Sequence, residues 1–106
     1  MQTKSIAEIQ KLVVPICKKY NIPKLYLFGS YATGTANANS DIDLAIDSSN
    51  LHGLLELLQV KQDLEDTCNT PVDLLTLRAI QTEETNPLKK DFIQNFYRER
   101  VCLYEQ

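Results

Sequence analysis

The alternating segment at residues 41–46 (DIDLAI) is the feature that most restricts how this chain can fold. Successive side chains of a β-strand point to opposite faces of a sheet. Ile42, Leu44 and Ile46 would therefore face a hydrophobic core, while Asp41 and Asp43 would share the other face. The pattern predicts a strand that packs on a core with one side and presents two carboxylates on the other.

The rest of the chain predicts helices and strands in alternation. Helices are expected at residues 5–20, 51–68 and 87–98, with a short helix and loop within 31–39. Strands are expected at residues 24–28, 41–46, 71–77 and 101–104. Pro15 should kink or split the first helix, because proline lacks the backbone N–H and clashes with the preceding turn. This order predicts an α/β or α+β sandwich and leaves the order of strands in the sheet open.

Composition bounds the size and the partners of the protein. A chain of 106 residues with 43% hydrophobic and 24% charged residues is typical of a single folded domain, expected over residues 1–106. The net charge of -3 argues against binding long nucleic acid, because contacts with the phosphate backbone need clustered lysine and arginine. Any bound nucleotide is therefore expected to be small.

Neither the apolar segments nor the cysteine spacing of the chain indicates a membrane, secretion or metal-binding signal. No apolar run approaches the roughly 20 residues that cross a bilayer, and the first residues lack a signal peptide's apolar segment, so we expect a cytoplasmic protein. Cys17, Cys68 and Cys102 are far apart and lack a CxxC spacing. They predict neither a disulfide framework nor a zinc site, and we expect all three to be buried.

Gly29 and Ser30 directly follow the predicted strand at 24–28. A glycine there allows close approach to the backbone, and free amides at a following helix would attract phosphate. Taken alone, a Gly-Ser pair after a strand is an ordinary turn. Residues 29–34 have the outline G-x-x-x-x-G but lack the lysine of a Walker loop, so a P-loop NTPase is not expected.

Three aspartates are candidate metal ligands. Asp41 and Asp43 on one strand face would have Cα atoms roughly 6.5 to 7 Å apart, which one divalent cation can bridge. Asp73 lies in a separate hydrophobic strand, where an unpaired acid would be costly to bury. The alternative is that Asp41 and Asp43 form the solvated face of an edge strand. Asp47 is expected to cap a turn instead.

These motifs resemble the minimal nucleotidyltransferase family of the DNA polymerase beta superfamily. The resemblance rests on the segments LFGSYA at 27–32, Gly34 and SDIDL at 40–44. It extends in order and spacing to residues 13–20, 72–74 and 100–104, which together span nearly the whole chain. The resemblance implies a small mixed β-sheet flanked by helices, the nucleotidyltransferase fold.

The same resemblance implies roles for five residues. Gly29 and Ser30 would contact the triphosphate of ATP, and Asp41, Asp43 and Asp73 would be the catalytic acids and the ligands of Mg²⁺, with two ions expected. Thr33 is a departure, because the family commonly carries arginine between Ala32 and Gly34. Threonine cannot neutralise phosphate charge, so we expect weaker nucleotide binding or slower turnover.

The function implied is the transfer of AMP from ATP to a hydroxyl, with release of pyrophosphate. Members of this family are often paired with a HEPN-domain ribonuclease toxin, so the acceptor would be a tyrosine of that toxin and this chain would be the antitoxin. Two alternatives stay open: a non-catalytic antitoxin that neutralises its partner by binding, and an aminoglycoside-type nucleotidyltransferase. The nucleobase, the number of transfers and the oligomeric state are not determined by the sequence.

Overall fold

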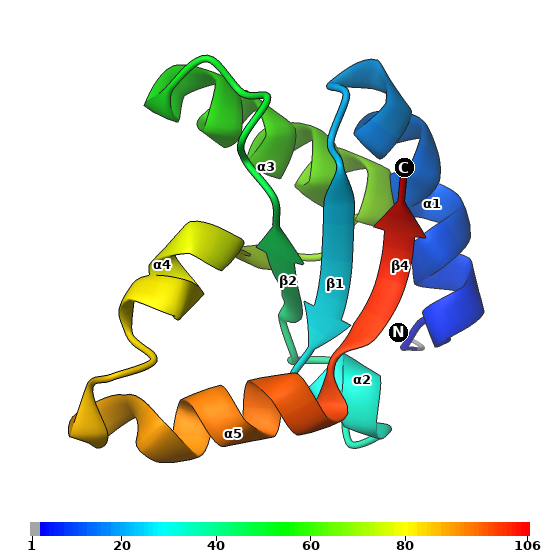
Figure 1. Cartoon of the computed structure of the whole chain (residues 1–106). Helices are drawn as coiled ribbons and strands as arrows, with labels where there is room; N and C mark the ends of the chain where they lie inside the picture. The colour runs from blue at the N-terminus through cyan, green and yellow to red at the C-terminus, as the bar shows by residue number, and fades with distance from the viewer. Residues whose placement is uncertain (1–2) are drawn as a thin grey trace.

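A mixed sheet lies at the centre of the computed structural model, which describes residues 3–106 (Figure 1). In chain order the elements are α1 (Ile6–Lys19), β1 (Lys24–Phe28), α2 (Ser30–Thr33), β2 (Ile42–Ile46), α3 (Leu54–Cys68), β3 (Val72–Thr76), α4 (Leu77–Thr82), the 3₁₀ helix η1 (Pro87–Lys89), α5 (Lys90–Glu99) and β4 (Val101–Glu105). Residues 1 and 2 of the predicted domain lie outside the described range, and the single-domain organisation stays a prediction.

The strands follow the order β3-β2-β1-β4 across the sheet. β1 pairs antiparallel with both β2 and β4, whereas β2 and β3 are parallel. Parallel neighbours need a long crossover connection, and α3 provides it between β2 and β3. The expected mixed sheet flanked by helices is therefore confirmed.

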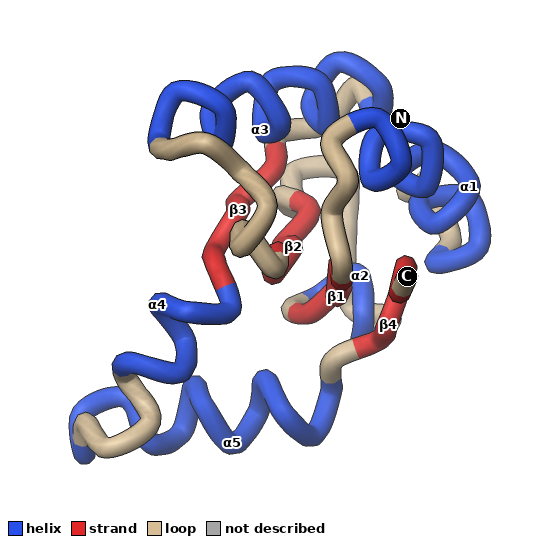
Figure 2. The backbone as a smooth tube through the Cα atoms, turned by 45° about the horizontal axis from the view of Figure 1, so that its top comes forward, coloured by secondary structure: helices blue, strands red, loops and turns tan. Residues whose placement is uncertain are grey.

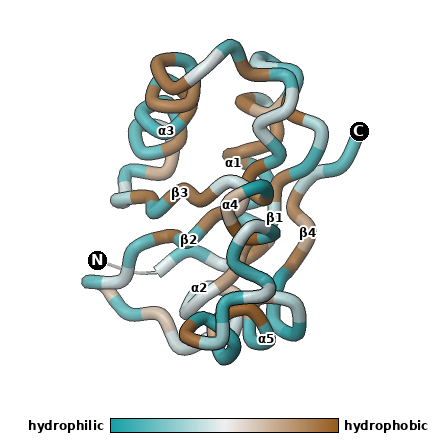
Figure 3. Tube along the Cα trace, turned by 60° about the vertical axis from the view of Figure 1, so that its left-hand side comes forward, coloured by the Kyte–Doolittle hydropathy of each residue, from teal (hydrophilic) through white to brown (hydrophobic). Residues whose placement is uncertain are grey.

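The helices lie on both faces of the sheet. α1 and α3 lie on one side of the strands and α5 crosses the other side (Figure 2). The main core lies under α1 and α3, and its strand residues include Ile42, Leu44 and Ile46, each at most 1% exposed. Hydrophobic residues are concentrated along the central strands (Figure 3). The alternation in residues 41–46 thus predicted the buried face correctly.

A second, smaller core lies on the opposite face of the sheet. Its buried residues are Phe28, Ala45, Ile80, Ile93 and Phe96, contributed by two strands, α4 and α5. The two phenylalanines contact edge to face, with ring centroids 5.3 Å apart. This core holds α5 across the sheet, and it determines what surrounds the aspartates on that face.

The first helix differs from one expectation. The capping box is present, with Glu8 N donating to Ser5 Oγ at 3.1 Å and Ser5 N donating to Glu8 Oε1 at 3.2 Å. Pro15 does not split the helix, which continues to Lys19. Buried side chains on both sides of the proline, such as Val13 and Ile16, pack into the main core, and this packing outweighs the lost hydrogen bond.

Other boundaries also differ from those predicted. α4 was not expected, and Leu77 begins this helix instead of ending a strand. Thr76 starts it, because its Oγ1 accepts a hydrogen bond from Ala79 N at 3.1 Å. Six residues are too short to show helical periodicity in sequence.

Cys17 and Cys68 are buried as expected, whereas Cys102 is exposed on β4. No helix within residues 3–106 has the length and apolar character needed to cross a membrane.

Candidate functional site

Asp43 and Asp73 are direct neighbours on the parallel strands β2 and β3. Neighbouring strands are about 4.8 Å apart, and paired residues project from the same face, so the two side chains lie next to each other. Ile42 N donates to Pro71 O at 2.9 Å, and Val72 N donates to Glu65 Oε2 at 2.9 Å. The first bond joins the beginnings of the two strands, and the second fixes the start of β3 to α3, just where the acids emerge.

Asp41 precedes β2 by one residue and completes the acidic group. Burial, together with the negative charges of Asp73 and then Asp41, raises the pKa of Asp43 from 3.8 to about 6. Asp41 and Asp73 are exposed, whereas Asp43 is half-buried. The structure thus places Asp43 and Asp73 side by side, with Asp41 near enough to act electrostatically on Asp43.

Gly29 lies at the end of β1 against the carboxylate of Asp43. A Cβ atom at this glycine would overlap Oδ2 of Asp43 and lie 3.0 Å from its Cγ. The backbone angles, φ 72° and ψ -155°, fall in a region that is essentially restricted to glycine. Only a residue without a side chain can occupy this position, so the bend after β1 brings free backbone close to the acids.

Ser30 begins α2 next to this bend. The first N–H groups of a helix have no acceptor within the helix, so the amide of Ser30 and its hydroxyl are available to a ligand. The hydroxyl of Thr33, in contrast, already has hydrogen-bond partners in the protein. Its Oγ1 lies 3.3 Å from Gly29 O, 3.4 Å from Ser30 O and 3.1 Å from Thr35 Oγ1. Its hydroxyl therefore bonds within α2 and the turn that follows it.

A pocket of about 340 Å³ opens beside the acids, and we call it the carboxylate pocket. It is lined by Phe28, Gly29, Asp43, Asp73, Leu75, Phe92, Asn95, Phe96 and Glu99. The sequence pattern did not predict the wall that α5 contributes to this pocket. Leu75 could have been found, because it follows Asp73 by two residues and so shares its strand face.

Residues 11–106 match the family described as Polymerase beta, Nucleotidyltransferase. The chain belongs to this family. The resemblance drawn from residues 27–32 and 40–44 is thereby confirmed, and the protein is a nucleotidyltransferase. Enzymes of this family use a nucleoside triphosphate and a divalent metal.

Individual relatives support the same assignment. A putative protein adenylyltransferase of Methanocaldococcus jannaschii is 35% identical over 91 residues, covering 86% of this chain and 92% of that protein. Protein adenylyltransferase MntA of Shewanella oneidensis is 42% identical over 65 residues, covering 58% of this chain and 47% of that protein. A solved structure of a tri-AMPylated Shewanella oneidensis HEPN toxin in complex with MNT antitoxin shares the fold, with a TM-score of 0.65, 19% identity and coverage of 95% of this chain and 73% of that chain.

The acidic group has the chemistry of a metal site, although its side chains are not preassembled around one point. Within residues 3–106, no three His, Cys, Asp or Glu side chains are close enough together to form a ready-made metal site. The chemistry nevertheless fits, because Asp43 and Asp73 are adjacent hard-oxygen donors. The raised pKa of Asp43 reflects burial first and then repulsion from Asp73 and Asp41, and a bound cation would relieve that repulsion. Asp47 lies outside this group and caps a turn as predicted, accepting from Ser49 N at 2.9 Å.

Proposed function

We propose that this nucleotidyltransferase is a magnesium-dependent protein adenylyltransferase that transfers AMP from ATP to a tyrosine hydroxyl of a partner HEPN ribonuclease toxin, and so acts as its antitoxin. The observation that carries this proposal is the adjacent pair Asp43 and Asp73 beside the bend at Gly29. The relatives named protein adenylyltransferase and the AMPylated HEPN toxin in complex with its antitoxin support the donor, the acceptor and the partner.

The arrangement across the sheet suits in-line transfer. Gly29 follows β1, Asp43 lies on β2 and Asp73 on β3, so the three positions form a row across neighbouring strands. The acceptor oxygen attacks the α-phosphorus as the bond to pyrophosphate breaks, with the entering and leaving oxygens roughly in line. We therefore assign pyrophosphate to Gly29 and Ser30, the α-phosphate to Asp43 and the acceptor hydroxyl to Asp73.

Each acid has a distinct part in this scheme. Asp41 and Asp43 would hold Mg²⁺ against the phosphates, and Asp73 would hold the second ion and orient the acceptor hydroxyl. The bound ions would neutralise phosphate charge and favour loss of the hydroxyl proton. Asp73 is exposed and lies on an edge strand, so a tyrosine carried by another protein can reach it. Because such a toxin and ATP meet in the cytoplasm, the proposal also places this protein there.

The test is an incubation of the purified chain with its partner toxin, ATP and Mg²⁺. Intact-mass analysis is expected to show the toxin gaining one or more AMP units, and tyrosine should carry them. Asp43→Asn should abolish the gain. Asp47→Asn is the matched control, because Asp47 is tied to the turn at Ser49 and should leave transfer unchanged. An unmodified toxin in the complete mixture would refute the proposal.

A second function is favoured by Thr33, which offers no positive charge to the phosphates. A non-catalytic antitoxin would neutralise its partner by covering it, with the acids retained but unused. Inhibition of the toxin's ribonuclease activity without ATP, accompanied by no change in toxin mass when ATP and Mg²⁺ are added, would establish that function instead.

A further inference from the structure

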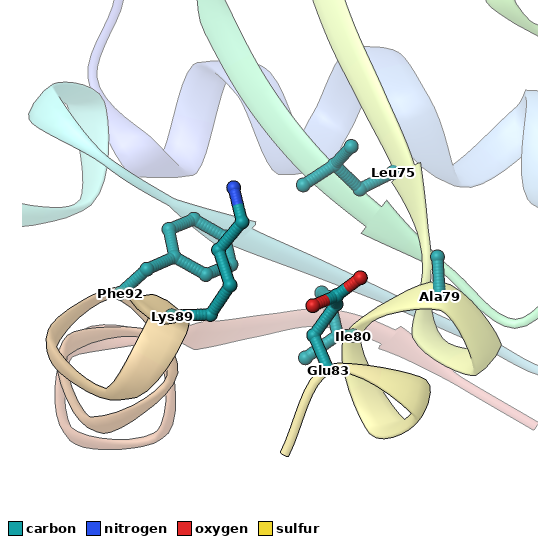
Figure 4. Close-up of a pocket in the computed structure, with 6 residues that line it drawn as sticks. All are labelled: Leu75, Ala79, Ile80, Glu83, Lys89 and Phe92. Carbon is teal, nitrogen blue, oxygen red and sulfur yellow. The ribbon is translucent and has the colours of Figure 1, made fainter. Parts of the chain in front are cut away.

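A second pocket continues from the carboxylate pocket along the same sheet face. It has a volume of about 250 Å³ and is lined by Leu75, Ala79, Ile80, Glu83, Lys89 and Phe92 (Figure 4). Leu75 and Phe92 also line the carboxylate pocket, so the two hollows adjoin. We call this second hollow the distal pocket.

The direction from the acids to the distal pocket matches the path of a nucleoside. In-line transfer places the leaving and attacking oxygens along the row that crosses the strands, so the ribose must leave the α-phosphorus at a steep angle to that row. Leu75 lies two residues beyond Asp73, about 7 Å further along β3. The distal pocket is therefore displaced along the strand direction, where a nucleoside attached to the α-phosphate would extend.

The walls of the distal pocket suit a flat aromatic base. Leu75 and Ile80 are apolar, and Phe92 is 38% exposed, so its ring has a surface free for stacking. Two polar groups accompany this apolar lining. In Figure 4 the side chain of Lys89 extends beside the ring of Phe92, and the carboxylate of Glu83 lies across the pocket from it.

Glu83 is fixed in orientation by its neighbour. Asn86 Nδ2 donates to Glu83 Oε2 at 2.7 Å, which leaves Oε1 as an acceptor toward the pocket. Lys89 carries only donors. One acceptor and one donor at the rim of an apolar pocket complement adenine, whose exocyclic amino group donates and whose adjacent ring nitrogen accepts.

We propose that the distal pocket binds the adenine base of the nucleotide, with Glu83 accepting from its amino group and Lys89 donating to a ring nitrogen. The proposal rests on the nucleotide-transfer function above and adds the source of base selectivity. A guanine in the same position would direct its carbonyl oxygen at the carboxylate of Glu83, which has no proton to donate.

Binding of α,β-methylene-ATP with Mg²⁺ to the full chain, measured by calorimetry, tests the site without catalysis. Lys89→Ala should weaken binding about tenfold, the loss expected for a hydrogen bond to a charged group. Lys90→Ala is the matched control, because it removes the same charge from the adjacent residue, which does not line the pocket. Inorganic tripolyphosphate should bind the wild type and Lys89→Ala equally, since it has no base.

Glu83→Gln tests the reading of the base edge. The bond from Asn86 would hold the new amide oxygen, so the NH₂ group would face the pocket in place of Oε1. Reversing the polarity in this way should weaken binding of the ATP analogue and strengthen binding of the matching GTP analogue, so that their affinity ratio falls about tenfold or more. Thermal melting should confirm that each variant remains folded.

The outcomes separate this proposal from the one on which it rests. Suppose that the wild type binds the ATP analogue and that both variants, Lys89→Ala and Glu83→Gln, bind the ATP and GTP analogues with wild-type affinity. The base then lies elsewhere and the proposal is overturned. If these variants bind nucleotide normally but transfer to the toxin with a raised KM for the toxin, the pocket receives the acceptor and the proposal is again overturned. If the wild type binds no nucleotide at all, nucleotide transfer itself fails.

Discussion

Gly29 and Asp43 are packed so closely that the carboxylate occupies the space a side chain at Gly29 would need. This contact joins the bend after β1 to the acid of β2, although thirteen residues of chain lie between them. The bend at Gly29 and the acidic group therefore form one structural unit.

Gly29→Ala should disrupt this unit. The methyl group would displace Asp43 and strain the backbone at φ 72°, costing about 1 to 3 kcal/mol of stability. Gly34→Ala is a matched control, because Gly34 also has a positive φ, 80°, but a Cβ there would meet no atom within 4 Å. Urea unfolding and nucleotide titration should show the larger loss of both stability and binding for Gly29→Ala. Equal losses would mean that the contact with Asp43 is unimportant.

Asp43 should make the stability of the metal-free protein depend on pH. Its pKa in the folded protein, about 6, is above the ordinary 3.8, so between these values the folded state binds more protons than the unfolded chain. The free energy of unfolding should therefore rise as the pH falls through about 6 and level off near 3.8. Asp43→Asn should lose this gain and be more stable than the wild type at pH 8.

The measurement for Asp43 is urea unfolding of both proteins in chelator from pH 4 to pH 8. Because other titrating groups are common to the two proteins, the difference between their curves isolates this carboxylate. A difference that is the same at every pH would show that the pKa of Asp43 is not raised.

Asp73→Asn should impair transfer much more than it impairs nucleotide binding. If Asp73 acts at the acceptor, its loss removes several kcal/mol of transition-state stabilisation, which is about a hundredfold or more in rate. Phosphates held at Gly29 and Ser30 should keep the dissociation constant of the ATP analogue within a few fold. Single-turnover AMP transfer and calorimetry measure the two quantities, and an unchanged rate would remove Asp73 from the site.

Thr33→Arg should strengthen nucleotide binding. Thr33 is exposed on α2, so arginine can be accommodated there, and a guanidinium can make a bidentate contact with phosphate. We expect the dissociation constant of the ATP analogue to fall about three- to tenfold, since hydrogen bonds to charged groups contribute about 1.5 to 3 kcal/mol before solvent screening. Thr33→Lys shows how much of the gain is charge alone. No gain with either variant would mean that position 33 does not face the phosphates.

The pattern of residues 24–28 and 41–46 was sufficient to predict two strands and the buried face of β2. That succeeded because alternation depends only on strand geometry, which is local. Of the two outcomes predicted for Pro15, a kink or a split of α1, the split was wrong, because the local cost of proline was judged without the core contacts of Val13 and Ile16. α4 was missed because six residues carry too little periodicity.

The candidate site divides in the same way between what is local and what is not. Local sequence patterns indicated the candidate residues of the site, which are a glycine and a serine after one strand and aspartates at two others. The pairing of Asp43 with Asp73 and the close approach of Gly29 to Asp43 follow from how the strands pack in three dimensions. The pocket lined by Glu83, Lys89 and Phe92 likewise exists only in the folded chain. The physical reason is that side-chain direction along a strand follows from local backbone geometry, whereas strand order, register and the position of α5 depend on packing between segments distant in sequence.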